Sequence, residues 1–329
     1  MPLRLLRVYH SSPHIKDFLK DVPVVDIIEE KRGKNNVTDI ILSAEDADAV
    51  IEKLQKHLSK EKYRMLIIPV EATVPRMEEE EKEEEKEEKK ERRSIEEIYQ
   101  DITESASLSK TYITLVILAS IVAAIGILYN DVAIVIGSMV IAPLLNPNIA
   151  LALSTTLAES NLAKRAVITS IIGYAIAFFI GIIFGMFMKE EANAYHVISR
   201  SNITLMYILL ALSAGIAGSL SVTKGVPQAL VGVMVAVALL PPLVTGGLLA
   251  GSMQFYHALG AILLFMVNVV CINLAGVITF IAQGITPRTW WEKRKAKKTI
   301  WKSMLIWLLL LFLIVLTIIF YSNKFVISQ

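Results

Sequence analysis

The chain has 329 residues, 54% of them hydrophobic, and a formal net charge of +2. Its mean hydropathy of +0.55 argues against a single soluble domain, and the small net charge gives no reason to expect nucleic-acid binding. The lone cysteine, Cys271, excludes an intrachain disulfide framework. Residues 1–21 lack an uncharged apolar segment, so we expect no cleavable signal peptide.

Residues 1–75 have ordinary polarity and predict a small soluble α+β domain. We expect a short helix over 13–20 and a second helix that begins after Ser43 and continues to Leu58. Four strands are expected at residues 3–9, 24–30, 37–42 and 63–70. The order β-α-β-β-α-β is that of ferredoxin-like domains. Such a domain could bind a metabolite or pair with a second copy, and a packing role without a ligand is equally open.

A charged linker and an amphipathic helix follow this domain. Every residue from 78 to 93 is Glu, Lys or Arg, so the segment 76–93 cannot bury apolar surface and is expected to be solvated. Ser94 and Glu97 then form a capping box. The apolar stripe behind it predicts an amphipathic helix over 94–110, placed at the membrane surface or against a partner.

Seven apolar segments follow, each long enough to cross a hydrocarbon core of roughly 30 Å as a helix that rises 1.5 Å per residue. We therefore predict a mainly α, polytopic membrane protein with a small soluble domain at its amino terminus. The expected spans are residues 111–129, 132–154, 166–188, 203–223, 226–250, 257–283 and 303–322.

The charges of the connections predict the orientation of these spans. With a cytoplasmic amino terminus, the inner connections carry Lys164 and Arg165, then Lys224, then a basic run from Arg288 to Lys302. The outer connections carry few cations, which is the positive-inside pattern. We therefore expect a multi-pass protein of the cell membrane with its carboxy terminus outside. Interfacial aromatics are expected beside the basic run, which is flanked by Trp290, Trp291, Trp301 and Trp307.

A repeated phrase divides the membrane region into two halves. Residues 137–147 read Gly-Ser-Met-Val-Ile-Ala-Pro-Leu-Leu-Asn-Pro, and residues 232–242, 95 positions later, read Gly-Val-Met-Val-Ala-Val-Ala-Leu-Leu-Pro-Pro. Each repeat has three spans, an odd number, so the second must be inverted. The predicted units are 111–200 and 201–285, followed by a basic loop and a seventh helix over 286–329. Re-entrant hairpins are the alternative, but they would turn the Lys164 connection outward.

The first copy of this phrase also resembles a known family. The run from Ile136 to Pro147 is similar to the signature of the prokaryotic "uncharacterised hydrophobic proteins", catalogued as domain of unknown function 389. The resemblance covers roughly residues 105–285, and the small amino-terminal domain fits the archaeal-type layout of that family. It implies a multipass membrane fold. No catalytic or binding residue follows from it.

Prolines and polar side chains coincide at the two copies, and they predict a binding site. Prolines free backbone carbonyls within the membrane, and these carbonyls, with amide oxygens, suit a dehydrated monovalent cation or a small polar solute. The candidate binding residues are Ser138, Asn146, Asn148 and Thr245. The candidate helix-break residues are Gly137, Pro143, Pro147, Gly232, Pro241 and Pro242. Alternatively, Asn146 and Asn148 only cap the broken helix.

Other polar and small residues in the spans favour helix packing. Asn268 and Asn273 are interpreted mainly as helix–helix contacts, and Gly181 and Gly185 as sites of close approach. No span carries Asp, Glu, Lys or Arg at its centre, which argues against a simple proton-coupled antiporter. No catalytic constellation, metal ligand set or cofactor motif is found, so we do not expect an enzyme.

The function predicted from these patterns is a membrane transporter or channel for a small solute or ion. Its partners would be the lipid bilayer, that solute and further copies of the chain in a homo-oligomer. The amino-terminal domain would regulate it from the cytoplasm. The alternative is a non-transporting receptor or assembly platform whose amino-terminal domain binds a ligand.

Overall fold

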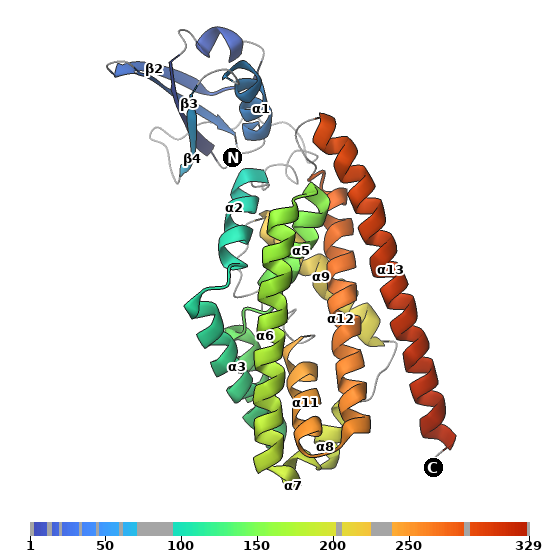
Figure 1. Cartoon of the computed structure of the whole chain (residues 1–329). Coiled ribbons are helices and arrows are strands. Elements are labelled where there is room, and N and C mark those ends of the chain that lie inside the picture. Colours follow the sequence, from blue (N-terminus) through green and yellow to red (C-terminus); the bar gives the residue numbers. More distant parts are fainter. Residues whose placement is uncertain are drawn as a thin grey trace, which may run out of the picture. The chain divides into compact units, whose positions relative to one another are not determined.

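The structure is a computed structural model that describes residues 3–11, 15–19, 22–32, 35–43, 46–58, 62–70, 95–201, 206–224, 239–285 and 290–327. The predicted charged linker and Gly232 lie outside these ranges. The chain forms two compact units, one of residues 1–100 with 223–225 and one of residues 101–222 with 226–329. Figure 1 labels the elements of both.

The amino-terminal unit contains a four-stranded antiparallel sheet of order β2-β3-β1-β4. The strands are β1 (Leu3–His10), β2 (Asp26–Arg32), β3 (Asn35–Ser43) and β4 (Arg64–Val70), which confirms the four predicted strands. The short helix predicted over 13–20 is, in the residues that the structure describes, a 3-10 helix, η1 (Ile15–Leu19).

One face of this sheet packs against helix α1 (Ala47–Leu58). Leu6 and Val8 alternate with outward residues along β1 and are fully buried, and Leu54 and Leu58 of α1 are among the residues that cover them. On the opposite face Arg7 donates two hydrogen bonds to Asp39, its partner across β1 and β3, at 2.7 and 2.6 Å. These bonds and the negative charge of Asp39 raise the pKa of Arg7.

The predicted amphipathic helix is α2 (Ile95–Ser105), which is shorter than expected. Its first turn is joined to β1, because Arg4 donates from Nε to Glu97 Oε1 at 2.6 Å and from a terminal nitrogen to Oε2 at 3.2 Å. After α2, residues 106 and 107 form a turn. Helix α3 (Lys110–Leu128) then begins after Ser109, whose hydroxyl accepts a hydrogen bond from the Tyr112 N–H at 3.0 Å.

Five helices in the described ranges are long and apolar enough to cross a membrane. They are α3, α6 (Ser160–Phe187), α9 (Met206–Lys224), α12 (Phe255–Ala282) and, over residues 300–318, α13 (Trp290–Ile327). They correspond to the predicted spans one, three, four, six and seven. Predicted span two is a bent pair, α4 (Val132–Ile141) and α5 (Leu145–Leu157), whose axes differ by 49°. Of predicted span five, the structure describes residues 239–250, mostly within α11 (Leu240–Gly251).

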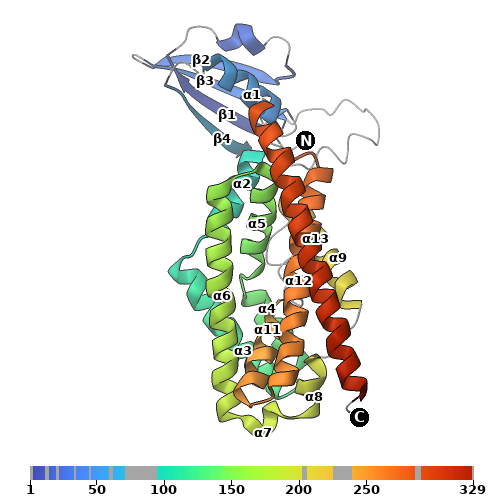
Figure 2. The same ribbon diagram turned by 45° about the vertical axis from the view of Figure 1, so that its right-hand side comes forward.

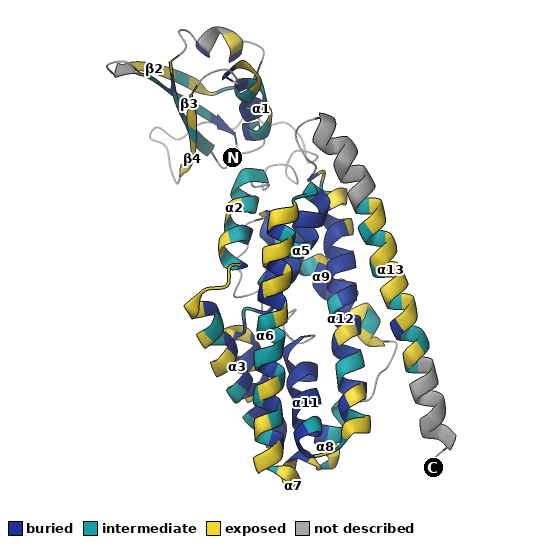
Figure 3. Ribbon diagram, in the orientation of Figure 1, coloured by how far each residue is buried: buried dark blue, intermediate teal, exposed yellow. Residues whose placement is uncertain are grey.

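Helices α6 and α12 cross the second unit in opposite directions (Figures 1 and 2). Both α5 and α11 pack against both of them. The short helices α7 (Lys189–Ala192), α8 (Tyr195–Ile198) and η3 (Ser199–Ser201) follow α6. As Figure 3 shows, α11 and much of α12 are buried.

Helix α13 lies at the periphery of this unit. One stripe of its side chains, Trp307, Leu311, Ile314 and Ile318, packs against a buried cluster from α9 and α12. Most of its other described side chains are exposed, including Trp301 and Phe312. A helix with one packed stripe and an apolar exterior fits a membrane environment better than water.

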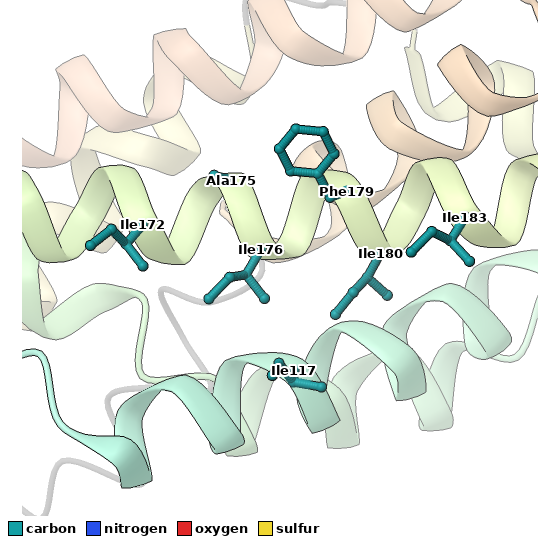
Figure 4. A pocket seen from close by; sticks show the side chains of 7 residues that line it. All are labelled: Ile117, Ile172, Ala175, Ile176, Phe179, Ile180 and Ile183. Carbon is teal, nitrogen blue, oxygen red and sulfur yellow. The ribbon is translucent and has the colours of Figure 1, made fainter.

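A second apolar surface lies between α3 and α6, where a groove of about 430 Å³ opens to the outside (Figure 4). All of its lining side chains are aliphatic or aromatic: Ile117, Ile172, Ala175, Ile176, Phe179, Ile180 and Ile183. None of them offers a polar group to a ligand. The groove is therefore not a candidate for binding an ion or a polar solute.

Candidate functional site at the broken helix

The break between α4 and α5 is centred on Pro143. A residue before proline is sterically disfavoured in the helical region. Ala142 accordingly has φ −73° and ψ 116°, so α4 ends at Ile141. At the other end of α4, the Asp131 carboxylate accepts hydrogen bonds from the N–H groups of Ala133 and Ile134 at 2.9 and 3.1 Å.

The other candidate prolines lie in the first turns of the half-helices. Pro147 is the third residue of α5, and Pro241 and Pro242 are the second and third residues of α11. Proline is tolerated there because the first N–H groups of a helix have no partner within it. At the first break, Pro143 and Pro147 also deprive the carbonyls of Met139 and Pro143 of the donors that a continuous helix would supply.

Asn148, one residue after Pro147, is the centre of a buried hydrogen-bond network. Its side chain is 1% exposed, and Nδ2 donates to the Leu144 carbonyl at 2.8 Å. Its amide also pairs with the hydroxyl of Tyr174 on α6, at 2.7 Å from Nδ2 and 2.9 Å from Oδ1. Asn273 on α12 donates from Nδ2 to Asn148 Oδ1 at 3.0 Å and to the Val269 carbonyl at 2.8 Å. The network therefore joins α5, α6 and α12.

The contacts of Asn273 define how its amide is turned. Nδ2 lies between two acceptors, so exchanging the nitrogen and oxygen would set an oxygen against both of them. Oδ1 must therefore point elsewhere. It is buried and has no hydrogen-bond partner among the described residues. An acceptor without a donor is unusual inside a protein and requires an explanation.

The remaining candidate binding residues occupy different environments. Ser138 is buried on α4, and its hydroxyl donates to the Val135 carbonyl at 2.6 Å, so its proton is used within its own helix. Asn146 is half-buried, and its side chain forms no hydrogen bond with the residues that the structure describes. Thr245 on α11 is fully buried, and its hydroxyl likewise lacks a described partner.

Gly137 is not part of the break. It lies inside α4, five residues before Ala142, on an exposed face where an added Cβ would meet nothing within 4 Å. A glycine is tolerated inside a membrane helix, whereas Pro143 ends it. The equivalent Gly232 is outside the described residues.

Opposed glycines bring α11 against α6. Gly181 of α6 lies against Gly247 of α11, Gly185 lies against the Leu248 backbone, and Gly251 lies against the Ile182 backbone. A Cβ added at Gly181 would lie 2.6 Å from the Val244 carbonyl oxygen and 3.0 Å from Gly247 Cα. The backbones therefore touch, as the predicted close approach at Gly181 and Gly185 requires.

Sequence reasoning missed Tyr174 and gave Asn273 mainly a packing role. Tyr174 is a single tyrosine near the middle of α6, and its hydroxyl needs a partner when it is removed from water. A tyrosine at the centre of an apolar span was therefore a usable signal. Nothing local to the sequence connects it with Asn148, 26 positions earlier, or with Asn273 on another helix.

The fold and the site define a class: a multi-helical protein with several potential membrane crossings and a buried polar network at a helix break. The family model described as domain of unknown function (DUF389) matches residues 139–274. An uncharacterized protein of Methanocaldococcus jannaschii is 38% identical over 289 residues, which are 88% of this chain and 89% of that protein. The chain therefore belongs to the DUF389 family. No solved structure matches it.

Proposed function

We propose that this protein is an integral membrane transporter or channel for a small solute or ion, with its site at two paired helix breaks. The observation that carries the proposal is the network of the buried Asn148 and Asn273 with the half-buried Tyr174, among apolar helices beside the first break. Burying polar groups in such surroundings costs free energy, so they are retained where they bind, conduct or fix a structure. Broken helices are a recurring way to build such sites in transporters.

Matching elements support an inverted 3+3 repeat as the scaffold of this site. Helices α6 and α12 each have 28 residues and begin 95 positions apart, since 255 − 160 = 95. Helices α5 and α11 also begin 95 positions apart, since 240 − 145 = 95. They are followed by left-handed residues at Ala158 and Met253, with φ 57° and 69°. The opposite directions of α6 and α12 fit an inverted second copy.

The 95-residue offset between the repeats also indicates that the polar residues of the network have no polar counterparts in the other repeat. Moving Asn148 and Tyr174 by 95 positions gives Leu243 and Val269, and moving Asn273 back by 95 gives Phe178. All three counterparts are apolar. We infer a symmetric scaffold whose polar site is built around α5, with α11 supplying Thr245 from the second copy.

The proposal places seven spans in the cell membrane, with a cytoplasmic amino terminus and an external carboxy terminus, in a homo-oligomer. The positive-inside distribution of Lys164, Arg165 and the basic run before α13 supports this orientation. The first unit would be a regulatory domain of the ferredoxin-like type, which the strand order β2-β3-β1-β4 supports.

A flux assay tests the function. The full chain is reconstituted in liposomes, and uptake is measured for a panel of monovalent cations, anions and small uncharged solutes. We expect saturable uptake of one class above that of empty liposomes. The variants Asn148→Leu and Tyr174→Phe should reduce it at least tenfold.

Thr317→Val on α13 is the matched control, because the Thr317 hydroxyl only donates to its own helix at Leu313, at 2.9 Å. It should leave flux unchanged. If all variants retain wild-type flux, the site assignment is wrong. If the folded protein moves no member of the panel, the transport proposal gives way to a receptor or assembly role.

A further inference from the structure

We propose that the network at the α4–α5 break binds an electropositive ligand, either a desolvated monovalent metal cation or an ammonium group, through acceptor oxygens that include Asn273 Oδ1. This inference rests on the proposed function, because it names the ligand class of the same site. It follows from counting the donors and acceptors that the network leaves unused.

The donors of the network are already occupied. Each amide carries two N–H hydrogens, and the tyrosine carries one O–H hydrogen. Those of Asn148 point to the Leu144 carbonyl and the Tyr174 hydroxyl. Those of Asn273 point to Asn148 Oδ1 and the Val269 carbonyl, and Tyr174 donates to Asn148 Oδ1. An anion entering this site would find none of these five N–H and O–H hydrogens free. The buried hydroxyls of Ser170, one turn before Tyr174, and of Thr245 keep the hydrogens that have no described acceptor.

Acceptors, by contrast, remain available. Asn273 Oδ1 belongs to a side chain that is 0% exposed, and it has no partner among the described residues. Thr245 Oγ1, on a helix that packs against α12, is equally buried and also lacks a described partner. A hydroxyl can accept while its proton turns away. Both atoms can therefore ligate a cation or accept from an N–H group.

The backbone at the breaks has the same bias. The N-terminus of a helix normally attracts anions through its free N–H groups. Pro147 removes one of the first three N–H groups of α5, and Pro241 and Pro242 remove two of the first three of α11. The carbonyls of Met139 and Pro143 have meanwhile lost their helical donors. The first turns of α5 and α11 thus offer fewer donors than an ordinary helix N-terminus, and the first break adds two carbonyl acceptors.

The helices around the network carry no charged side chains at this depth, which favours a monovalent over a divalent cation. Helices α5, α11 and α12 contain no Asp, Glu, Lys or Arg. Ca²⁺ and Mg²⁺ sites depend on carboxylates, and no group of three or more His, Cys, Asp or Glu side chains among the described residues could hold a metal ion. Neutral amide, hydroxyl and carbonyl oxygens are the ligands that monovalent cations use in selective pores.

Ligand-dependent thermal stability of the purified full-length protein in detergent tests the inference. Na⁺, K⁺ and NH₄⁺ are titrated as chlorides, with ionic strength held constant by tetramethylammonium chloride, which offers no N–H donor. We expect a saturable rise in Tm with at least one of the three, and the same curve when gluconate replaces chloride. The three arms distinguish a metal ion from an ammonium group.

Variants assign the effect to the network. Asn273→Leu, which removes Oδ1, should weaken the apparent affinity at least tenfold. Thr317→Val should behave as wild type. Because Asn273→Leu could fail to fold, Thr245→Val, which removes a single hydroxyl, is measured beside it and should also weaken binding.

The inference is overturned if no cation gives a saturable shift, or if Asn273→Leu and Thr245→Val both bind as tightly as wild type. A saturable shift that depends on the anion would also contradict it. Saturable flux of an anion or uncharged solute, without any cation-dependent shift, would refute the ligand class and leave the transport proposal intact. Cation binding without flux would support the ligand class and refute the transport proposal.

Discussion

The contact between α6 and α11 gives a quantitative prediction for Gly181→Ala. The added Cβ would lie 2.6 Å from the Val244 carbonyl oxygen, whereas carbon and oxygen atoms approach to about 3.3 Å in close helix contacts. The backbones must therefore separate by roughly 0.7 Å at this point. Such overpacking costs about 1–3 kcal/mol.

Gly137→Ala is the matched control, because it makes the same change inside a helix where nothing lies within 4 Å of the new Cβ. Both variants gain up to about 1 kcal/mol of helix propensity, so their difference isolates the steric cost. At roughly 2–4 °C per kcal/mol, Gly181→Ala should melt about 2–12 °C below Gly137→Ala. Circular dichroism during heating of both variants in detergent measures the difference in melting temperature. Equal melting temperatures would refute the proposed backbone contact.

Three further predictions concern buried or partly buried side chains. Asn148→Leu leaves the Leu144 carbonyl and neighbouring donors unpaired and should lower stability by about 1–3 kcal/mol, as measured by chemical unfolding. Glu97→Gln weakens the charge-assisted pair with Arg4 and should destabilise the protein by about 1–2 kcal/mol in the same assay; an unchanged midpoint would contradict the pairing. Cys271 is 0% exposed and should resist a maleimide in the native protein yet react after unfolding, which mass spectrometry detects.

Much of the helical framework followed from the sequence, because long apolar runs bounded by charged turns leave few alternatives in a membrane. The break was predicted from Pro143 and Pro147, since proline has a local steric effect. Gly137 was assigned to the same break because it recurs in the repeated phrase, but recurrence does not bend a helix. Within the segment 13–20, where the sequence predicted a short helix without its type, residues 15–19 form a 3-10 helix, a type that is used in short connections.

The candidate site was only partly predictable. Asn146 and Asn148 were predicted together, because both are amides next to Pro147 within an apolar run, and the structure places only Asn148 in the network. Its partners Tyr174 and Asn273 are brought to it by tertiary packing of α6 and α12 against α5, which no local pattern encodes. The packing role expected for Asn273 is consistent with its bond to Asn148. The sequence could not predict that Asn273 Oδ1 points away from its neighbours and has no described donor.

The central claim is that the α4–α5 break lies on a path for polar solutes, and cysteine accessibility tests it most directly. In a Cys271→Ala background, Asn146→Cys places a thiol beside the break, and Ile176→Cys places one in the apolar groove between α3 and α6 (Figure 4). A charged, membrane-impermeant thiol reagent is added to the protein in sealed vesicles. The proposal predicts that Asn146→Cys reacts and Ile176→Cys does not. Failure of Asn146→Cys to react from either side of the membrane would contradict it.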